Sequence, residues 1–318
     1  MTEHPVSLRL VQIRLEAQDI ASYEFHSADE RPLPPFTAGA HIDLAMPGGM
    51  VRSYSLVNSP SDGGRYVVAV RREADGKGGS AWMHSTPRVG ALLASSTPAN
   101  DFALDEDAAE SIFIAGGIGV TPFMAMARRL NALGKPWRMH YAARSPETAA
   151  FVHDLSGLAQ TPGAVEWCFS SVAGKRLDLA AIVQAAPVQA HLYCCGPAGM
   201  IDAFLQASAN RPADRIHTER FGAAAEAATE GGFEVVLKKS GRCFPVLAGK
   251  TILDTLLDNA VDVQYACMAG VCGTCQTGVL QGTPDHRDDY LTDEEKQSNK
   301  TIMICCSGAR TKSLTLDL

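Results

Sequence analysis

The sequence has 318 residues, a length that suits two or three domains because single hydrophobic cores stop growing near ~250–300 residues. Hydrophobic residues make up 46% and charged residues 20%, a composition typical of globular domains rather than disordered chains. The formal net charge of −7 leaves no basic excess for binding phosphates, so we expect no nucleic-acid partner.

Residues 1–15 lack the uninterrupted apolar stretch of a signal peptide, and no window approaches the roughly 18–20 apolar residues of a membrane span. We therefore expect a cytoplasmic monomer with no membrane partner. Five of the nine cysteines fall between Cys267 and Cys306. Without an export signal, such a group indicates metal or redox chemistry rather than a disulfide framework.

Residues 1–103 contain short runs of alternating apolar and polar residues, such as 6–10 and 66–70, separated by turn-rich pieces. Many short strands with little helix predict a small antiparallel β-barrel. We expect this first domain to bind a flavin, because of two groups of residues within it.

The first group is Arg52, Tyr54 and Ser55, on a predicted strand where alternation places the arginine and tyrosine on one side and the serine on the other. An arginine can hold a phosphate with two N–H groups. A tyrosine ring can pack on an isoalloxazine, and a serine hydroxyl can donate to a flavin ring atom. Taken alone, this pattern fits a structural arginine better.

The second group follows Arg71 and Arg72. There, Gly78, Gly79 and Ser80 begin a predicted short helix whose backbone N–H groups would form an anion site. A phosphate loop downstream of the arginine strand favours the flavin interpretation over a purely structural one.

Residues 104–222 change to alternating strands and helices, which predicts a doubly wound nucleotide-binding domain with a parallel sheet. A helix is expected over residues 121–133, with Thr121 as N-cap, Pro122 at the first position and Gly134 as the stop. The strands are expected at residues 111–115, 137–143 and 191–195.

A glycine-rich turn joins the first of these strands to the helix and contains Gly116, Gly117, Gly119 and Thr121. This is the context that a dinucleotide pyrophosphate loop requires, although Pro122 stands where the third glycine of the full motif would be. A simple packing turn is the alternative.

Two further groups follow other strands of this domain. Cys195, Gly196, Pro197 and Met200 lie at the end of the strand 191–195, where open α/β sheets collect their ligands. Arg144 and Ser145 follow the strand 137–143 and could contact the adenosine ribose.

Residues 223–232 are small and polar, which predicts an interdomain linker, with a surface helix as the alternative because of the alanines. Residues 233–318 then form a third domain. It is expected to begin with a hairpin and a short helix capped by Thr251.

Cys267, Cys272 and Cys275 have the C-x4-C-x2-C spacing of a plant-type [2Fe–2S] cluster. The fourth ligand is Cys305 or Cys306. Cys305 is favoured because residues 276–304 give the 29 intervening positions that are common in plant-type ferredoxins. Zinc is the alternative metal, but structural zinc sites usually pair two C-x2-C units or use histidines.

These residues together resemble the phthalate dioxygenase reductase family, including vanillate O-demethylase reductases, over essentially the whole chain and in the same domain order. The stretches that carry the resemblance are residues 52–55, 72–80, 116–122, 195–197, 284–288 and 316–318. One departure is Gly308, where an arginine often follows Cys-Cys-Ser in the family.

The resemblance implies a flavin barrel, a nucleotide domain and a β-grasp ferredoxin domain. It also implies FMN rather than FAD, NADH rather than NADPH, and a Rieske-type terminal oxygenase as the electron acceptor. FAD remains an alternative because related FAD enzymes share the arginine–tyrosine–serine strand. Phe221 is implied to lie against the flavin near the nicotinamide site.

We therefore expect an oxidoreductase that takes hydride from NADH onto the flavin and passes single electrons through the cluster to a partner. Ser55, Thr121, Cys195 and Phe221 are expected to line the reaction centre. A reductase for a cytochrome P450 or another monooxygenase is the alternative enzyme. A redox-sensing regulator would need an effector domain, and the three modules leave no stretch for one.

Overall fold

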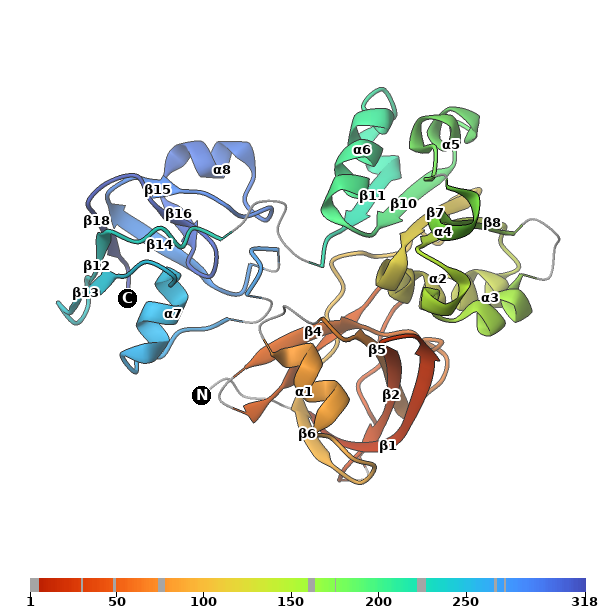
Figure 1. Ribbon diagram of the computed structural model, residues 1–318, viewed down its shortest axis with the longest axis horizontal. Coiled ribbons are helices and arrows are strands. Elements are labelled where there is room, and N and C mark those ends of the chain that lie inside the picture. Colours follow the sequence, from red (N-terminus) through yellow and green to blue (C-terminus); the bar gives the residue numbers. More distant parts are fainter. Residues whose placement is uncertain are drawn as a thin grey trace. The chain divides into compact units, whose positions relative to one another are not determined.

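The computed structural model describes residues 6–29, 31–47, 50–73, 78–159, 164–174, 176–221, 227–265, 268–271 and 273–318. The described residues divide into two compact units, the first ending at Arg220 and the second running from Phe221 to Leu318 (Figure 1). No helix in the described ranges is long and apolar enough to cross a membrane.

The first unit begins with a six-stranded antiparallel sheet of order β4-β3-β6-β1-β2-β5. In β1, alternating residues such as Leu8 and Leu10 point into the core. A bridge between Leu56 and Val68 joins the two edges of the sheet and closes the expected barrel. The elements are β1 (Val6–Ala17), β2 (Ile20–Ser27), β3 (His41–Ala45), β4 (Val51–Ser55), β5 (Arg65–Arg71), α1 (Gly79–Ser85) and β6 (Leu92–Ser95).

The same unit continues with a parallel five-stranded sheet of order β11-β10-β7-β8-β9. In β7, Phe113 faces the core under α2 and α3, whereas Ile112 and Ile114 face the core under α5 and α6. Helices on both faces confirm the doubly wound sheet. The strands are β7 (Ser111–Gly116), β8 (Trp137–Ala143), β9 (Val165–Phe169), β10 (His191–Cys195) and β11 (Ile216–Glu219).

The helices of this sheet are α2 (Thr121–Leu133), α3 (Val152–Leu158), α4 (Ser170–Ala173), α5 (Leu179–Ala185) and α6 (Ala198–Ser208), with short 3-10 turns η2 (Gly117–Val120), η3 (Pro146–Thr148) and η4 (Ala213–Arg215). Helix α2 has the predicted limits, and Gly134 ends it in the left-handed conformation (φ +66°). The expected N-cap is wrong by one position. Because η2 runs directly into α2, Val120 precedes the helix, and the Thr121 hydroxyl donates to the Ile118 carbonyl instead.

The barrel and the parallel sheet share one core. Ile20 and Ala69 of the barrel pack in the same apolar cluster as Phe113 and Phe123 of the nucleotide-binding part. This shared core explains why the two predicted domains form one compact unit.

The second unit is a mixed sheet of order β13-β12-β18-β14-β16, with a separate β15–β17 pair. Strand β12 pairs antiparallel with β13, as the predicted hairpin requires, and parallel with β18. The elements are β12 (Phe233–Leu237), β13 (Cys243–Val246), α7 (Ile252–Asp258), β14 (Gln276–Gln281), β15 (Pro284–Asp285), α8 (Asp293–Ser298), β16 (Thr301–Met303), β17 (Gly308–Ala309) and β18 (Ser313–Leu316).

Helix α7 buries Ile252 and Leu256 in the core of this sheet, which is the β-grasp arrangement. Its predicted cap is confirmed. The Thr251 hydroxyl accepts from the Asp254 backbone N–H, and the Asp254 carboxylate accepts from the Thr251 N–H. These two bonds satisfy N–H groups that a helix start would otherwise leave unpaired.

Part of the predicted linker packs within the second unit. Residues 222–226 lie outside the described part of the chain. Beyond them, Ala228 is buried, and its N–H donates to the carbonyl of Cys306 at 2.7 Å. The Gly232 N–H donates to Val246 at 2.9 Å. Small residues in this stretch therefore permit close packing.

Candidate functional site

The flavin end of the barrel brings Arg52 of β4 onto the first turn of α1. A Cβ added at Gly79 would lie 2.8 Å from Arg52 Cγ and 2.9 Å from Nε, so a larger residue there would have to displace the arginine side chain. Gly78 precedes the helix with φ +87°, and the Ser80 hydroxyl accepts from the Glu73 N–H. The Arg52 guanidinium and the start of α1 thus lie side by side, and the guanidinium is suited to bind an anionic group.

Tyr54 and Ser55 follow on β4. Burial raises the pKa of the Tyr54 hydroxyl, and Ser55 is almost fully buried. The intervening Ser53 donates its hydroxyl to Asp43 on β3 at 2.5 Å. Ser53 is therefore bonded inside the barrel, and Arg52, Tyr54 and Ser55 remain the predicted flavin contacts of this strand.

The two downstream arginines have different surroundings. Arg71 Nε lies 3.5 Å from a Glu73 carboxylate oxygen in an exposed pair. Arg72 is bound to the β1–β2 turn, where its guanidinium donates to Asp19 at 2.8 Å and its N–H donates to the Asp19 carbonyl. These contacts of Arg72 stabilise the barrel, and its expected contact with a phosphate stays a prediction.

The carboxyl ends of β7 and β10 meet through two glycines. A Cβ at Gly116 would lie 2.7 Å from both Pro197 Cδ and Met200 Sδ, and a Cβ at Gly196 would lie 3.1 Å from Gly116 Cα. The structure therefore brings together both predicted groups, at the edge of the sheet where nucleotides bind. A side chain at either glycine would occupy the space between these two strand ends.

Gly119 completes that arrangement, because a Cβ there would lie 2.2 Å from the carbonyl oxygen of Cys195. Gly117 has φ +57°, a conformation that glycine adopts without strain. Thr121 is buried and its hydroxyl is already bonded to Ile118. Glycine at position 119 is therefore required by the close packing of η2 against β10, whether or not a ligand binds there.

Arg144 and Ser145 follow β8 at the same edge of the sheet, since β8 is the neighbour of β7. Arg144 is exposed, and its carbonyl accepts from the Ser171 N–H at 2.8 Å. The Ser145 N–H donates to the Thr148 hydroxyl in a capping box. The Arg144 side chain therefore projects from a rigid turn.

The structure adds Glu219, which the sequence interpretation missed. Parallel pairing of β10 with β11 places Glu219 beside Cys195, with carboxyl oxygen Oε2 3.9 Å from the sulfur. Burial, with a contribution from Asp101, raises the pKa of Glu219 to about 8. Burial also raises the pKa of the Cys195 thiol, and Glu219 adds to that effect. A buried carboxyl that holds its proton near neutral pH is typical of functional sites.

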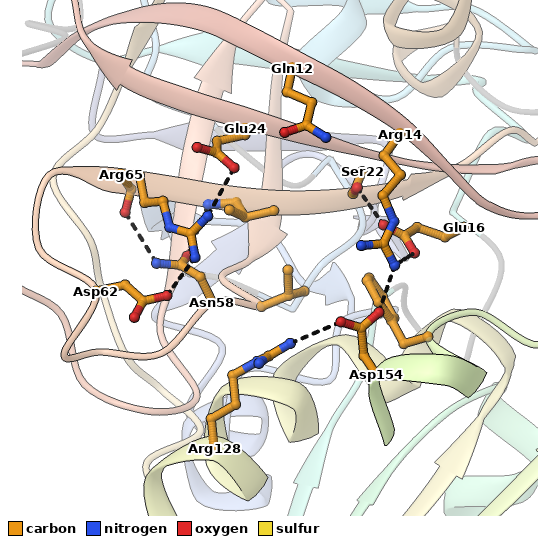
Figure 2. A pocket seen from close by; sticks show the side chains of 13 residues that line it. Gln12, Arg14, Glu16, Ser22, Glu24, Asn58, Asp62, Arg65, Arg128 and Asp154 are labelled. Atoms are coloured by element: carbon orange, nitrogen blue, oxygen red, sulfur yellow. Dashed lines mark hydrogen bonds and ion pairs between the residues drawn. The ribbon is translucent and has the colours of Figure 1, made fainter. Parts of the chain in front are cut away.

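A polar cavity of about 260 Å³ lies between the barrel and helices α2 and α3 of the first unit (Figure 2). Arg14 of β1 donates to Asp154 of α3 at 2.6 Å, and Arg128 of α2 lies 3.5 Å from the other oxygen of Asp154. Asp154 points between the two arginines. This contact joins the barrel to the nucleotide-binding part, and none of the predicted site residues lines the cavity.

The cysteine loop of the second unit is partly described. Cys275 and Cys305 are buried, whereas the predicted ligands Cys267 and Cys272 lie outside the described residues. Gly270 and Gly273 have φ +73° and +76°, which favours glycine at both positions. Two buried thiols and a loop with glycine at two left-handed positions are compatible with an iron–sulfur centre.

Cys306 also points into the protein. Its sulfur lies 3.8 Å from the Ser307 hydroxyl, and a Cβ at Gly270 would lie 2.5 Å from it. A hydrogen bond with Cys305, and then burial, raise the pKa of the Cys306 thiol. Cys306 therefore packs behind the loop, as a neighbour of Cys305.

Gly308, where the family often has arginine, has a packing reason in this chain. A Cβ at this position would lie 2.7 Å from the Cβ of Ala228. The missing side chain leaves room for Ala228, in the stretch that precedes β12 of the same unit.

Comparison with known proteins agrees with this geometry. Residues 235–310 match the family "2Fe-2S iron-sulfur cluster binding domain". The chain is 50% identical over 317 residues to "Phenoxybenzoate dioxygenase subunit beta" of Ectopseudomonas oleovorans, covering 100% of this chain and 98% of the relative.

Two solved structures extend the likeness to the fold. Phthalate dioxygenase reductase, described as a modular structure for electron transfer from pyridine nucleotides to [2Fe–2S], superposes with a TM-score of 0.83 at 37% identity, covering 98% of each chain. An intact type IV self-sufficient cytochrome P450 monooxygenase gives a TM-score of 0.75 at 38% identity, covering 98% of this chain and 41% of that one. This chain belongs to the phthalate dioxygenase reductase family of iron–sulfur flavoprotein oxidoreductases, the FMN- and [2Fe–2S]-dependent reductases of oxygenase systems.

Proposed function

We propose that this protein takes hydride from NADH in its first unit and delivers single electrons from its second unit to a Rieske-type terminal oxygenase. The observation that carries the proposal is that one chain holds both the facing glycines Gly116 and Gly196 and the glycine-containing cysteine loop. FMN, when bound, accepts two electrons as hydride and releases them singly, which suits a one-electron cluster.

In the barrel, Arg52 and the turn of Gly78, Gly79 and Ser80 would hold the flavin phosphate, with Arg71 and Arg72 as further candidates. Tyr54 would pack against the flavin ring, and Ser55 would donate a hydrogen bond to it. Support comes from the contact between Arg52 and Gly79 at the start of α1. These residues fix the ring by contact and take no part in proton transfer.

In the nucleotide-binding part, the turn after β7 would bind the pyrophosphate of NADH. Arg144 and Ser145 would contact the adenosine ribose. Cys195 and Thr121 would orient the nicotinamide, with Phe221 covering the flavin. Orientation is the main contribution a protein makes to hydride transfer. The residues of the pyrophosphate and strand-end site are Gly116, Gly117, Gly119, Thr121, Cys195, Gly196, Pro197 and Met200.

In the second unit, Cys267, Cys272, Cys275 and Cys305 would ligate the cluster. Support comes from the burial of Cys275 and Cys305 and from the family match over residues 235–310. We propose domain limits of 1–103, 104–222 and 233–318, joined by residues 223–232, in a cytoplasmic monomer. The free cysteines fit a reducing compartment, and light scattering tests the oligomeric state.

The experiment is anaerobic reduction of the purified protein by NADH, followed by absorbance, with flavin identity from mass spectrometry. We expect bleaching of overlapping flavin and [2Fe–2S] bands. In Cys305→Ser, the flavin should still be reduced but transfer to cytochrome c should be lost. Release of FAD would contradict the cofactor assignment, and cytochrome c reduction at the wild-type rate in the variant would contradict the electron route.

A second candidate is supply of electrons to a cytochrome P450. It is favoured by the self-sufficient P450 structure, 41% of which this chain covers. Reconstitution separates the two proposals. Product formation with a Rieske oxygenase and none with a P450 would support the first, and the reverse result would support the second.

A further inference from the structure

Asp288 closes the stretch 284–288, which carries part of the family resemblance but has no role in the proposed electron route. The residue is 3% exposed and its side chain is fully buried. A buried carboxylate is costly unless it is paired and hydrogen-bonded, so its contacts show what it holds in place.

The carboxylate of Asp288 joins two separate segments. Oxygen Oδ2 accepts from the Leu291 N–H at 2.8 Å, and Oδ1 accepts from the Ser307 hydroxyl at 3.3 Å. Ser307 is fully buried, and its hydroxyl accepts from the Arg287 N–H at 3.0 Å. The carboxylate thus ties residues 287–291 to a residue two positions beyond Cys305.

The opposite side of the 287–291 segment lies against the cysteine loop. The Asp289 N–H donates to the Gly270 carbonyl at 3.0 Å. A Cβ at Gly270 would lie 3.1 Å from Asp288 Cα, and one at Gly273 would lie 2.3 Å from the ring of Tyr290. One short segment therefore contacts both the described part of the loop and the turn after β16 that carries the fourth predicted ligand.

The charge of Asp288 is only loosely paired. Lys296 Nζ lies 4.0 Å from Oδ2, and its closer contact, 2.6 Å, is with the backbone carbonyl. His286 Nδ1 lies 3.6 Å from Oδ1, which is beyond hydrogen-bond distance, and neither ring nitrogen has a hydrogen-bond partner in the described structure.

We propose that Asp288 is a positioning residue of the iron–sulfur centre: its carboxylate sets the spacing between the cysteine loop and the turn after β16 that carries Cys305, and its negative charge disfavours reduction of the cluster. The proposal rests on the proposed function, since it assumes that the loop holds a [2Fe–2S] group. A hydrogen bond to a charged group holds local structure closed, and a nearby negative charge opposes an added electron.

Three variants of the full-length holoprotein test it. Asp288→Asn removes the charge and leaves one acceptor oxygen where two donors must be satisfied. Ser307→Ala removes the hydroxyl link but keeps the charge. Asp293→Asn, an exposed change in the first turn of α8, is the matched control for loss of one negative charge. Iron and sulfide content, the rate of cluster loss to a chelator, and the midpoint potential followed by EPR are measured.

We expect Asp288→Asn to lose its cluster about tenfold faster than the wild type, with a more positive midpoint potential and altered g values in the cluster that remains. Ser307→Ala should lose the cluster faster with a smaller shift in potential. Asp293→Asn should match the wild type.

Wild-type rates and potentials in both Asp288→Asn and Ser307→Ala would overturn the proposal. So would an Asp288→Asn variant that only melts at lower temperature, with unchanged potential and g values, because that is a purely structural effect. If Asp288→Asn does not fold, Ser307→Ala decides, and a wild-type rate of cluster loss there overturns the proposal. Absence of a cluster from the wild type would instead refute the proposed function.

Discussion

Cys195 and Glu219 lie side by side at the carboxyl ends of β10 and β11, with sulfur and carboxyl oxygen 3.9 Å apart. Neither residue is near the other in sequence, and only the parallel pairing of the two strands joins them. Because Cys195 belongs to the predicted nicotinamide site, a titrating carboxyl beside it has consequences for hydride transfer.

The first prediction concerns the pH dependence of flavin reduction by NADH. Above pH values near the pKa of Glu219, about 8, the carboxyl becomes a buried anion beside Cys195, whose carbonyl lies against Gly119, and this anion repels the negatively charged pyrophosphate of NADH. The stopped-flow rate should therefore fall by roughly tenfold at alkaline pH in the wild type, and the fall should be absent in Glu219→Gln. Asp101→Asn should move the fall to lower pH, because Asp101 helps to raise that pKa. An alkaline fall that persists in Glu219→Gln would assign it to another group.

The second prediction concerns acid stability. Burial, and then His191, lower the pKa of His217 from its usual 6.5. A base with a lowered pKa in the folded state is protonated more readily when unfolded, so stability is full above 6.5 and is lost as the pH falls below it. Between about pH 7 and about pH 5, the melting temperature of the wild type should fall further than that of His217→Asn, and the two drops should differ by a few degrees.

His26→Gln, which changes an exposed histidine of β2, is the control for this experiment. It should follow the wild-type curve. Some acid loss should remain in His217→Asn because burial lowers the pKa of His140 as well. An unchanged acid loss in His217→Asn would show that this histidine is not a source of the effect.

The third prediction concerns the glycine turn. Gly119→Ala would place a Cβ 2.2 Å from the carbonyl oxygen of Cys195, so β10 and η2 must separate. We expect a loss of about 1–3 kcal/mol in stability and a rise of at least tenfold (~1.4 kcal/mol) in the Kd for NADH. Gly157→Ala in α3 is the matched control, since a Cβ there meets nothing within 4 Å. Titration calorimetry measures the Kd for NADH in both variants, and thermal unfolding measures their stability. Wild-type NADH affinity in Gly119→Ala would refute the role of this packing.

The fourth prediction concerns the contact between the barrel and the nucleotide-binding part. Asp154→Asn removes the charge between Arg14 and Arg128, but Arg14 is about half exposed, so the loss of stability should be below about 1 kcal/mol. We expect flavin reduction at saturating NADH to slow by a few-fold, roughly 2–5-fold, because the two parts that form the site are held less firmly. Raising the salt concentration should bring the wild type towards the variant.

Asp62→Asn is the control, because Asp62 and its partner Arg65 both belong to the barrel part and line the same cavity. It should leave the reduction rate unchanged. Equal slowing in both variants would show that the cavity, rather than the contact across it, matters.

The sequence allowed the three modules, helix α2 and the Thr251 cap to be predicted, because each depends on local patterns: apolar periodicity, a glycine stop, a capping pair. Glu219 escaped because a single acidic residue in a short strand has no motif, and its partner lies 24 positions away. Strands β9 and β11 escaped for a related reason, since they are short and only partly buried.

Two arginines also show what the sequence could not predict. Arg52 and Arg72 look equally suited to a phosphate in the sequence. In the folded chain, Arg52 packs on Gly79, whereas Arg72 is bonded to Asp19 in a turn 53 positions earlier. Charge and spacing predict which residues could bind an anion, but they do not predict the long-range contacts, such as that of Arg72 with Asp19, that each residue makes in the folded chain.

The close contact between Gly308 and Ala228 constrains how this reductase can be recombined with its relatives. A ferredoxin module transplanted from a family member with arginine at this position would bring a large side chain to where Ala228 is buried, 2.7 Å from the Cβ that glycine lacks. A chimera joined after residue 232 would therefore combine mismatched halves of one packing contact. Crossovers placed before residue 227 carry both partners from the same parent and preserve the fit.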